Sequence, residues 1–71
     1  MADTRTDVRV LLLYGDQAEI TTPGHGADNP LRVPAATISV DSGIPVEELR
    51  GKRLTAVVDE AEGTARDFRR A

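Results

Sequence analysis

The sequence has no cysteine and no tryptophan, and its 71 residues include one histidine, one tyrosine and one phenylalanine. Disulfide bonds are therefore excluded. A structural zinc site is nearly excluded as well, because such sites need four Cys or His ligands and His25 is the only one available. A chain of this size buries only about 60% of the surface that its unfolded form exposes. With so small a core and no cross-links, oligomerisation or docking on a partner is the remaining source of extra stability.

Long apolar runs are absent too. The longest, Val10–Tyr14, is far shorter than the roughly 20 residues that a membrane-spanning helix needs. The segment Met1–Asp7 is polar and acidic, without the basic region and apolar stretch of a secretory signal. We therefore expect a cytoplasmic protein with no membrane partner. Residues 1–6 are predicted to be a disordered lead, and residues 7–71 a single small domain.

Patterns that bind phosphate or perform catalysis are missing. Twelve acidic residues against nine Lys and Arg give a net charge of −3, which disfavours a nucleic-acid partner. The Gly-rich loop 23–30 lacks the Gly-Lys-Ser/Thr ending of a nucleotide-binding loop, and no serine lies in a Gly-x-Ser-x-Gly motif. His25 has one nearby carboxylate, Asp28, which is fewer partners than a metal or catalytic site needs, so we expect a solvated loop side chain. No catalytic, metal or cofactor site and no small-molecule substrate is predicted, and the protein is not expected to be an enzyme.

What the sequence does contain is a strand without a polar face, over residues 8–14. Gly15-Asp16 follows as a two-residue hairpin turn, and residues 17–22 form the second strand. This turn places Leu13 opposite Ala18 and Leu11 opposite Ile20, which gives one clean core face. The other face of the first strand then carries a row of four large apolar side chains: Val8, Val10, Leu12 and Tyr14. Nothing else in so short a chain is expected to cover this row, so we predict that it binds a partner.

The middle of the chain is harder to assign. Residues 31–33 are long enough for a short third strand. Residues 35–42 can be strand or helix: Thr37–Asp41 alternates and is rich in β-branched residues, whereas Pro34 and Gly43 are typical of a helix start and stop. The helix is the favoured interpretation. Residues 45–50 indicate a further helical turn that Gly51 ends.

The last third of the sequence predicts a second hairpin, with strands at 52–58 and 64–69 and a polar turn between them. One helix over 54–69 is the alternative, because several apolar residues fall at helical spacing. Gly63 in the middle of such a helix would cost about 1 kcal/mol relative to Ala, which favours the hairpin. The predicted fold is therefore α+β: two antiparallel β-hairpins, about 8–22 and 52–69, form a small curled sheet or barrel with a short helical connector at about 35–50.

The function that follows is a non-enzymatic protein–protein interaction or assembly module, which self-associates or docks on a protein partner through the apolar row. The alternative is a small nucleic-acid-associated regulator. It would use a basic rim near the C-terminal hairpin, made of Arg50, Lys52, Arg53, Arg66, Arg69 and Arg70. Such a rim, on an otherwise acidic chain, would also steer protein partners.

Overall fold

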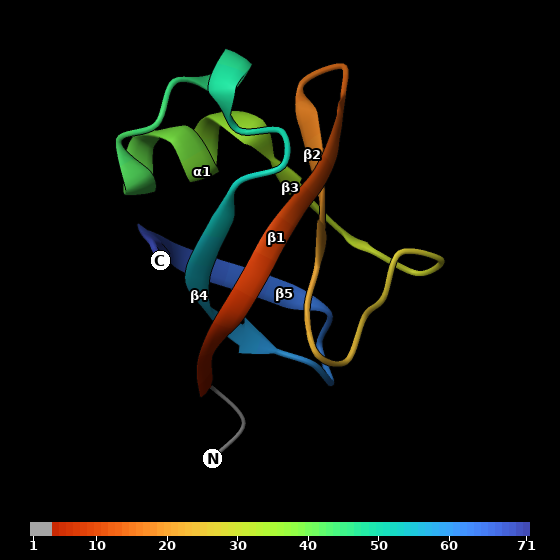
Figure 1. Cartoon of the computed structure of the whole chain (residues 1–71). Coiled ribbons are helices and arrows are strands. Elements are labelled where there is room, and N and C mark those ends of the chain that lie inside the picture. Colours follow the sequence, from red (N-terminus) through yellow and green to blue (C-terminus); the bar gives the residue numbers. More distant parts are fainter. Residues whose placement is uncertain (1–3) are drawn as a thin grey trace.

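The computed structural model describes residues 4–71, which form a curled five-stranded antiparallel sheet with one short α-helix (Figure 1). The elements along the chain are β1 (Thr4–Tyr14), β2 (Gln17–Thr21), β3 (Leu31–Pro34), α1 (Ala35–Ser42), the 3-10 turn η1 (Val46–Glu48), β4 (Arg53–Asp59) and β5 (Thr64–Arg70). The predicted α+β class with two hairpins and a helical connector is confirmed.

The structure also decides the assignments that the sequence left open. Residues 35–42 form a helix, and the C-terminal segment forms a hairpin. The predicted lead over residues 1–6 is too long, because residues 4–6 belong to β1 and pair with β4. Residues 1–3 of that lead lie outside the described residues.

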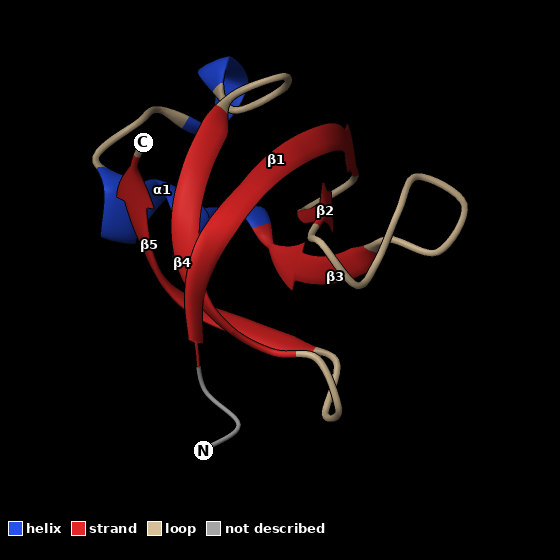
Figure 2. Cartoon of the chain, turned by 60° about the horizontal axis from the view of Figure 1, so that its bottom comes forward, coloured by secondary structure: helices blue, strands red, loops and turns tan. Residues whose placement is uncertain are grey.

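The strand order is β3-β2-β1-β4-β5, so β1 of the first hairpin lies beside β4 of the second and joins the two hairpins into one sheet. Its C-terminal half pairs with β2, and its N-terminal half, up to Arg9, pairs with β4. Three strands joined in succession, with the fourth returning beside the first, make a Greek key. The sheet curls around its core, and α1 packs across the open side against β5 and β3 (Figure 2).

A β-bulge in β1 sets the faces of the strand. Next to the turn the predicted register holds as far as Leu12 opposite Glu19. Leu11 is then an extra residue, and Val10 lies opposite Ile20. The predicted pair of Leu11 with Ile20 is therefore wrong. Because one extra residue moves all following side chains to the opposite face, the bulge changes which residues of β1 point inward.

This bulge divides the predicted partner-binding row. Val8 and Val10 lie in the core of the single chain, 3% and 0% exposed, and Leu13 packs against the same core from beyond the bulge. Leu12 is half-buried and Tyr14 is 72% exposed. The expectation that these residues share one uncovered face is therefore wrong. One copy of the chain covers half of the row by itself, so the row no longer gives a reason for obligatory association.

The core draws on every strand, on α1 and on the connection between α1 and β4. Its buried apolar residues are Val8, Val10, Ala18, Ile20, Leu31, Val33, Ala35, Ile38, Ile44, Leu49, Leu54, Ala56, Val58 and Phe68. Phe68 from β5 is the largest of the fully buried side chains. α1 contributes Ile38, and the chain after it turns back so that Ile44 joins the same cluster. The curled sheet and α1 therefore enclose one continuous core.

Gly43 makes that return possible, and replacing it with Ala is expected to destabilise the protein by about 1–2 kcal/mol. Its φ is 76°, and its N–H closes α1 on the carbonyl of Ser39 at 2.8 Å. A Cβ there would meet no atom within 4 Å, so the penalty comes from the left-handed backbone alone. Urea denaturation measures the difference. Gly26→Ala is the control, because the φ of Gly26 is not positive, and it should change stability by less than about 1 kcal/mol. Equal midpoints for the two variants would contradict this account of the helix end.

Candidate binding surface

The outer face of β1, β4 and β5 carries most of the positive charge of the chain. Inward side chains of these strands form the core, so the alternate positions point outward. Cross-strand pairing aligns Arg5 with Val57 and Val57 with Arg66, and it places Arg9 opposite Arg53. We call this surface the arginine face; its cations are Arg5, Arg9, Arg53, Arg66 and Arg69. Asp7 and Asp67 lie among them, so five arginines against two aspartates leave +3 on a chain whose net charge is −3.

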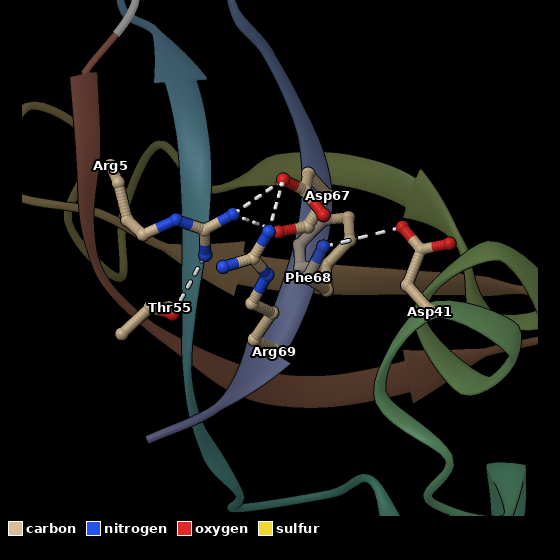
Figure 3. A network of polar contacts seen from close by, with 6 residues as sticks. All are labelled: Arg5, Asp41, Thr55, Asp67, Phe68 and Arg69. Carbon is tan, nitrogen blue, oxygen red and sulfur yellow. Dashed lines mark hydrogen bonds and ion pairs between the residues drawn. The ribbon is translucent and has the colours of Figure 1, made fainter.

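Asp67 organises one half of this face (Figure 3). Its Oδ2 accepts a hydrogen bond from Arg5 Nη2 at 2.6 Å and a longer one from Arg69 Nη2 at 3.4 Å. Arg5 also donates to the carbonyl of Asp67 at 2.9 Å and to Thr55 Oγ1 at 2.8 Å. One carboxylate thus serves two guanidinium groups, and these long side chains from β1 and β5 are held across β4.

A bulge in β5 permits this arrangement. The register of β4 and β5 shifts between Thr55 and Val57, and Asp67 takes a positive φ of 57° there. The bulge turns Asp67 outward while Phe68 points into the core. On its other side the strand is tied to the helix, because the N–H of Phe68 donates to Asp41 Oδ2 of α1 at 3.2 Å (Figure 3).

Arg9 and Arg53 form the other half of the face and are not compensated in this way. They lie directly opposite each other in the pairing of β1 with β4, and both are exposed. Within residues 4–71, neither guanidinium has a hydrogen bond or an ion pair. Like charges directly opposite each other destabilise a sheet, so this pair has a cost that the fold itself does not offset.

A pocket of about 330 Å³ opens beside these two arginines. It lies where β2 parts from β1: their pairing ends at Arg9 and Thr21, and the chain then turns away at Pro23. Its lining consists of Asp7, Val8, Arg9, Thr21, Thr22, Pro23, Arg53 and Ala71. The pocket therefore combines two guanidinium groups, one carboxylate and two threonines.

The six residues of the predicted basic rim do not form one surface. Arg53, Arg66 and Arg69 lie on the arginine face, whereas Arg50 and Lys52 are exposed in the connection between η1 and β4. Arg70 is used elsewhere: its Nε donates to the carbonyl of Ser42 and its Nη2 to that of Gly43, both at 3.3 Å. There it caps the C-terminal end of α1, where a cation is favourable.

A second polar cluster joins the loop after β2 to the turn between β4 and β5. The Glu60 carboxylate accepts hydrogen bonds from Thr22 Oγ1 at 3.1 Å, from the Gly24 N–H at 3.1 Å and from His25 Nδ1 at 2.7 Å. Because a carboxylate only accepts, His25 carries its proton on Nδ1. We call these four residues the Glu60 clasp. The prediction of a solvated loop histidine is wrong, since the His25 side chain is only 17% exposed.

The clasp perturbs the ionisation of Glu60. Partial burial of the carboxylate raises its pKa, but the hydrogen bonds from His25, Thr22 and Gly24, together with the charge of His25, outweigh this and lower the pKa below its ordinary value of 4.5. Within the part of the chain that the structure describes, no three His, Cys, Asp or Glu side chains gather as a metal site. The contacts of the clasp hold Thr22, and with it the adjoining wall of the pocket.

Replacing Glu60 with Gln is expected to remove part of the acid dependence of stability. The folded-state pKa lies below the ordinary value, so the carboxylate stabilises the fold above that value, and this contribution is lost as the pH falls through the folded-state pKa. Wild type and Glu60→Gln should therefore differ at about pH 6 and converge near about pH 3 in urea denaturation. Glu62→Gln, in the same turn, is the control and should follow wild type. A difference that is equal at both pH values would contradict this role of the carboxylate.

Among the described residues, no helix has the length and apolar character needed to span a membrane. Comparisons with family models, with curated proteins and with solved structures find no match to this chain.

Proposed function

We propose that the protein is a non-enzymatic interaction module that binds an acidic segment of a protein partner on the arginine face. The observation that carries the proposal is the pair Arg9 and Arg53, two exposed guanidinium groups opposite each other without an anionic partner in residues 4–71. An incoming carboxylate or phosphate would remove their mutual repulsion and gain charge-assisted hydrogen bonds. Charge complementarity of this kind also raises the rate of association with an acidic partner.

A protein is favoured over a nucleic acid because the face lacks aromatic side chains. Single strands bind by stacking bases on aromatic rings, and the two aromatic residues of this chain lie elsewhere: Tyr14 at the end of β1 and Phe68 in the core. On the outer face of β2 and β3, Arg32 is already paired with Glu19 at 3.3 Å. The overall charge of −3 also opposes nucleic acid.

Binding through the predicted apolar row is not part of this proposal. Val8 and Val10 are buried in the core of the folded chain, so their side chains do not form an exposed apolar surface on which a partner could dock. The proposed partner therefore contacts β1 through its charged outward positions.

Fluorescence anisotropy with a labelled oligo-glutamate peptide tests the proposal. Reversing one charge of the face, Arg53→Glu, should weaken binding by about tenfold or more. Arg32→Glu is the matched control, because Arg32 is an exposed arginine of β3 outside the face, and this variant should bind nearly as wild type does. Circular dichroism confirms that all variants fold.

Two results would overturn the proposal. Equal losses for the face variant and for Arg32→Glu would mean that the peptide senses only overall charge. Binding of an oligonucleotide but not of the peptide, with a steep dependence on salt, would favour the nucleic-acid alternative.

A further inference from the structure

We propose that the pocket beside Arg9 and Arg53 binds a phosphate monoester carried on a side chain of the partner, as in a phosphorylated segment. The inference rests on the proposed function, because it identifies the point at which the acidic partner would be anchored. Ligand oxygens would be held by the two guanidinium groups, with the Thr21 hydroxyl as a further donor in the same lining.

The size of the pocket and its number of donors favour phosphate over carboxylate. A carboxylate carries one negative charge and two oxygens, so it would leave one of the two positive charges uncompensated even where it contacts both arginines. A phosphate monoester carries about −1.5 to −2 charges and three free oxygens, enough for both arginines. The two side chains start from directly opposed positions on β1 and β4, and residues so placed have Cβ atoms roughly 5 Å apart. The volume of about 330 Å³ leaves room for a phosphate and for part of the side chain that carries it.

Asp7 opposes an anion in this pocket and gives the proposal a distinctive test. It is the one acidic side chain of the lining, so the side chains alone, two arginines against one aspartate, sum to +1. Replacing Asp7 with Asn should therefore strengthen phosphate binding. If the pocket were only a structural feature of the sheet, this substitution would not change phosphate affinity.

The Glu60 clasp makes the pocket ready to bind. Thr22 lines the pocket, and its hydroxyl is held by Glu60 from the opposite hairpin. Its backbone N–H donates to the carbonyl of His25 at 2.9 Å, and its carbonyl accepts from the N–H of His25 at 3.1 Å. A wall that is fixed before binding loses less entropy when the ligand arrives.

NMR titration of the full chain tests the inference with four probes: inorganic phosphate, a phosphoserine peptide, and the same peptide with Ser or with Glu at that position. The phosphopeptide should bind about tenfold or more tightly than either other peptide. Inorganic phosphate should shift the Nε–H signals of Arg9 and Arg53 and the Thr21 amide. Arg9→Gln with Arg53→Gln should abolish the preference for phosphate.

The matched control is Arg66→Gln with Arg69→Gln, on the same face but outside the pocket. This variant should weaken all three peptides and keep the preference for phosphate. If the phosphopeptide bound no more tightly than the Ser and Glu peptides, the inference would be overturned. Continued binding of the oligo-glutamate peptide in that case would leave the proposed function intact. Loss of the preference in the control variant would show that the pocket is not the site. Tighter binding of an oligonucleotide than of the phosphopeptide would assign the pocket to phosphate diesters and would equally overturn the inference.

Discussion

Replacing Phe68 with Ala is expected to remove a large part of the stability of the protein. Phe68 is the largest fully buried side chain, with 0% of its surface exposed, and it fills the space between the sheet and α1. Truncating a buried Phe to Ala costs about 3–5 kcal/mol, because apolar contact is lost and a cavity remains. A domain of this length has a total stability of about 4–10 kcal/mol, so the substitution removes from about a third of it to all of it.

Urea denaturation followed by circular dichroism measures this effect, and Tyr14→Ala provides the matched control. Tyr14 is the other aromatic residue of the chain and is 72% exposed, so its truncation should change stability by less than about 0.5 kcal/mol. Phe68→Leu should lie between the two, since it keeps most of the buried volume. If Phe68→Ala and Tyr14→Ala had the same stability, Phe68 would not be the centre of the core.

Turns and helix ends could be predicted from the sequence because they depend on local backbone chemistry. Gly15-Asp16 correctly predicted the turn of the first hairpin, and Gly43 correctly predicted the end of the helix at residues 35–42. The prediction from Gly63 that residues 54–69 do not form one helix is confirmed, and Gly63 lies in the hairpin turn with a φ of 71°. In each case a glycine adopts a conformation that other residues avoid.

The bulge at Leu11 could not be predicted because three leucines follow one another in the sequence. Alternation shows the phase of a strand only where apolar and polar residues differ. In a wholly apolar run the sequence does not show which side chains face the core, so the pattern predicts a regular strand by default. The apparent lack of a polar face arose because Val10 and Leu12 were assigned to one side, whereas the bulge separates them.

The candidate site was predicted only in part, since its contacts join residues far apart in the sequence. Arg53, Arg66 and Arg69 were found because the C-terminal hairpin was assigned correctly. Arg5 was missed because it was placed in the lead, and Arg9 because the pairing of β1 with β4 brings together residues more than forty positions apart. The alternation of charged residues at 5, 7 and 9 was the available signal, as it continues the strand toward the N-terminus.

The second large effect is expected in β1: Val10→Lys should abolish folding, whereas Leu12→Lys should leave the protein folded. Val10 is 0% exposed, and an ammonium group there would have no partner in the core, at a cost of several kcal/mol. Leu12 is half-buried on the other face opposite Glu19, so a lysine there keeps its charge in solvent and gains an oppositely charged cross-strand neighbour. Circular dichroism and the dispersion of amide proton signals distinguish a folded from an unfolded variant.

In a regular strand, positions 10 and 12 lie on one face, and the two lysine variants would behave alike. Opposite outcomes therefore test the bulge itself, independently of any binding measurement. Two unfolded variants, or two folded ones, would contradict the bulge, and two folded ones would also restore an apolar row that a single copy does not cover. With the bulge in place, residues 8–14 have two roles: Val8, Val10 and Leu13 pack in the core within one copy, and Arg9 remains outside, opposite Arg53, where the proposed anion would bind.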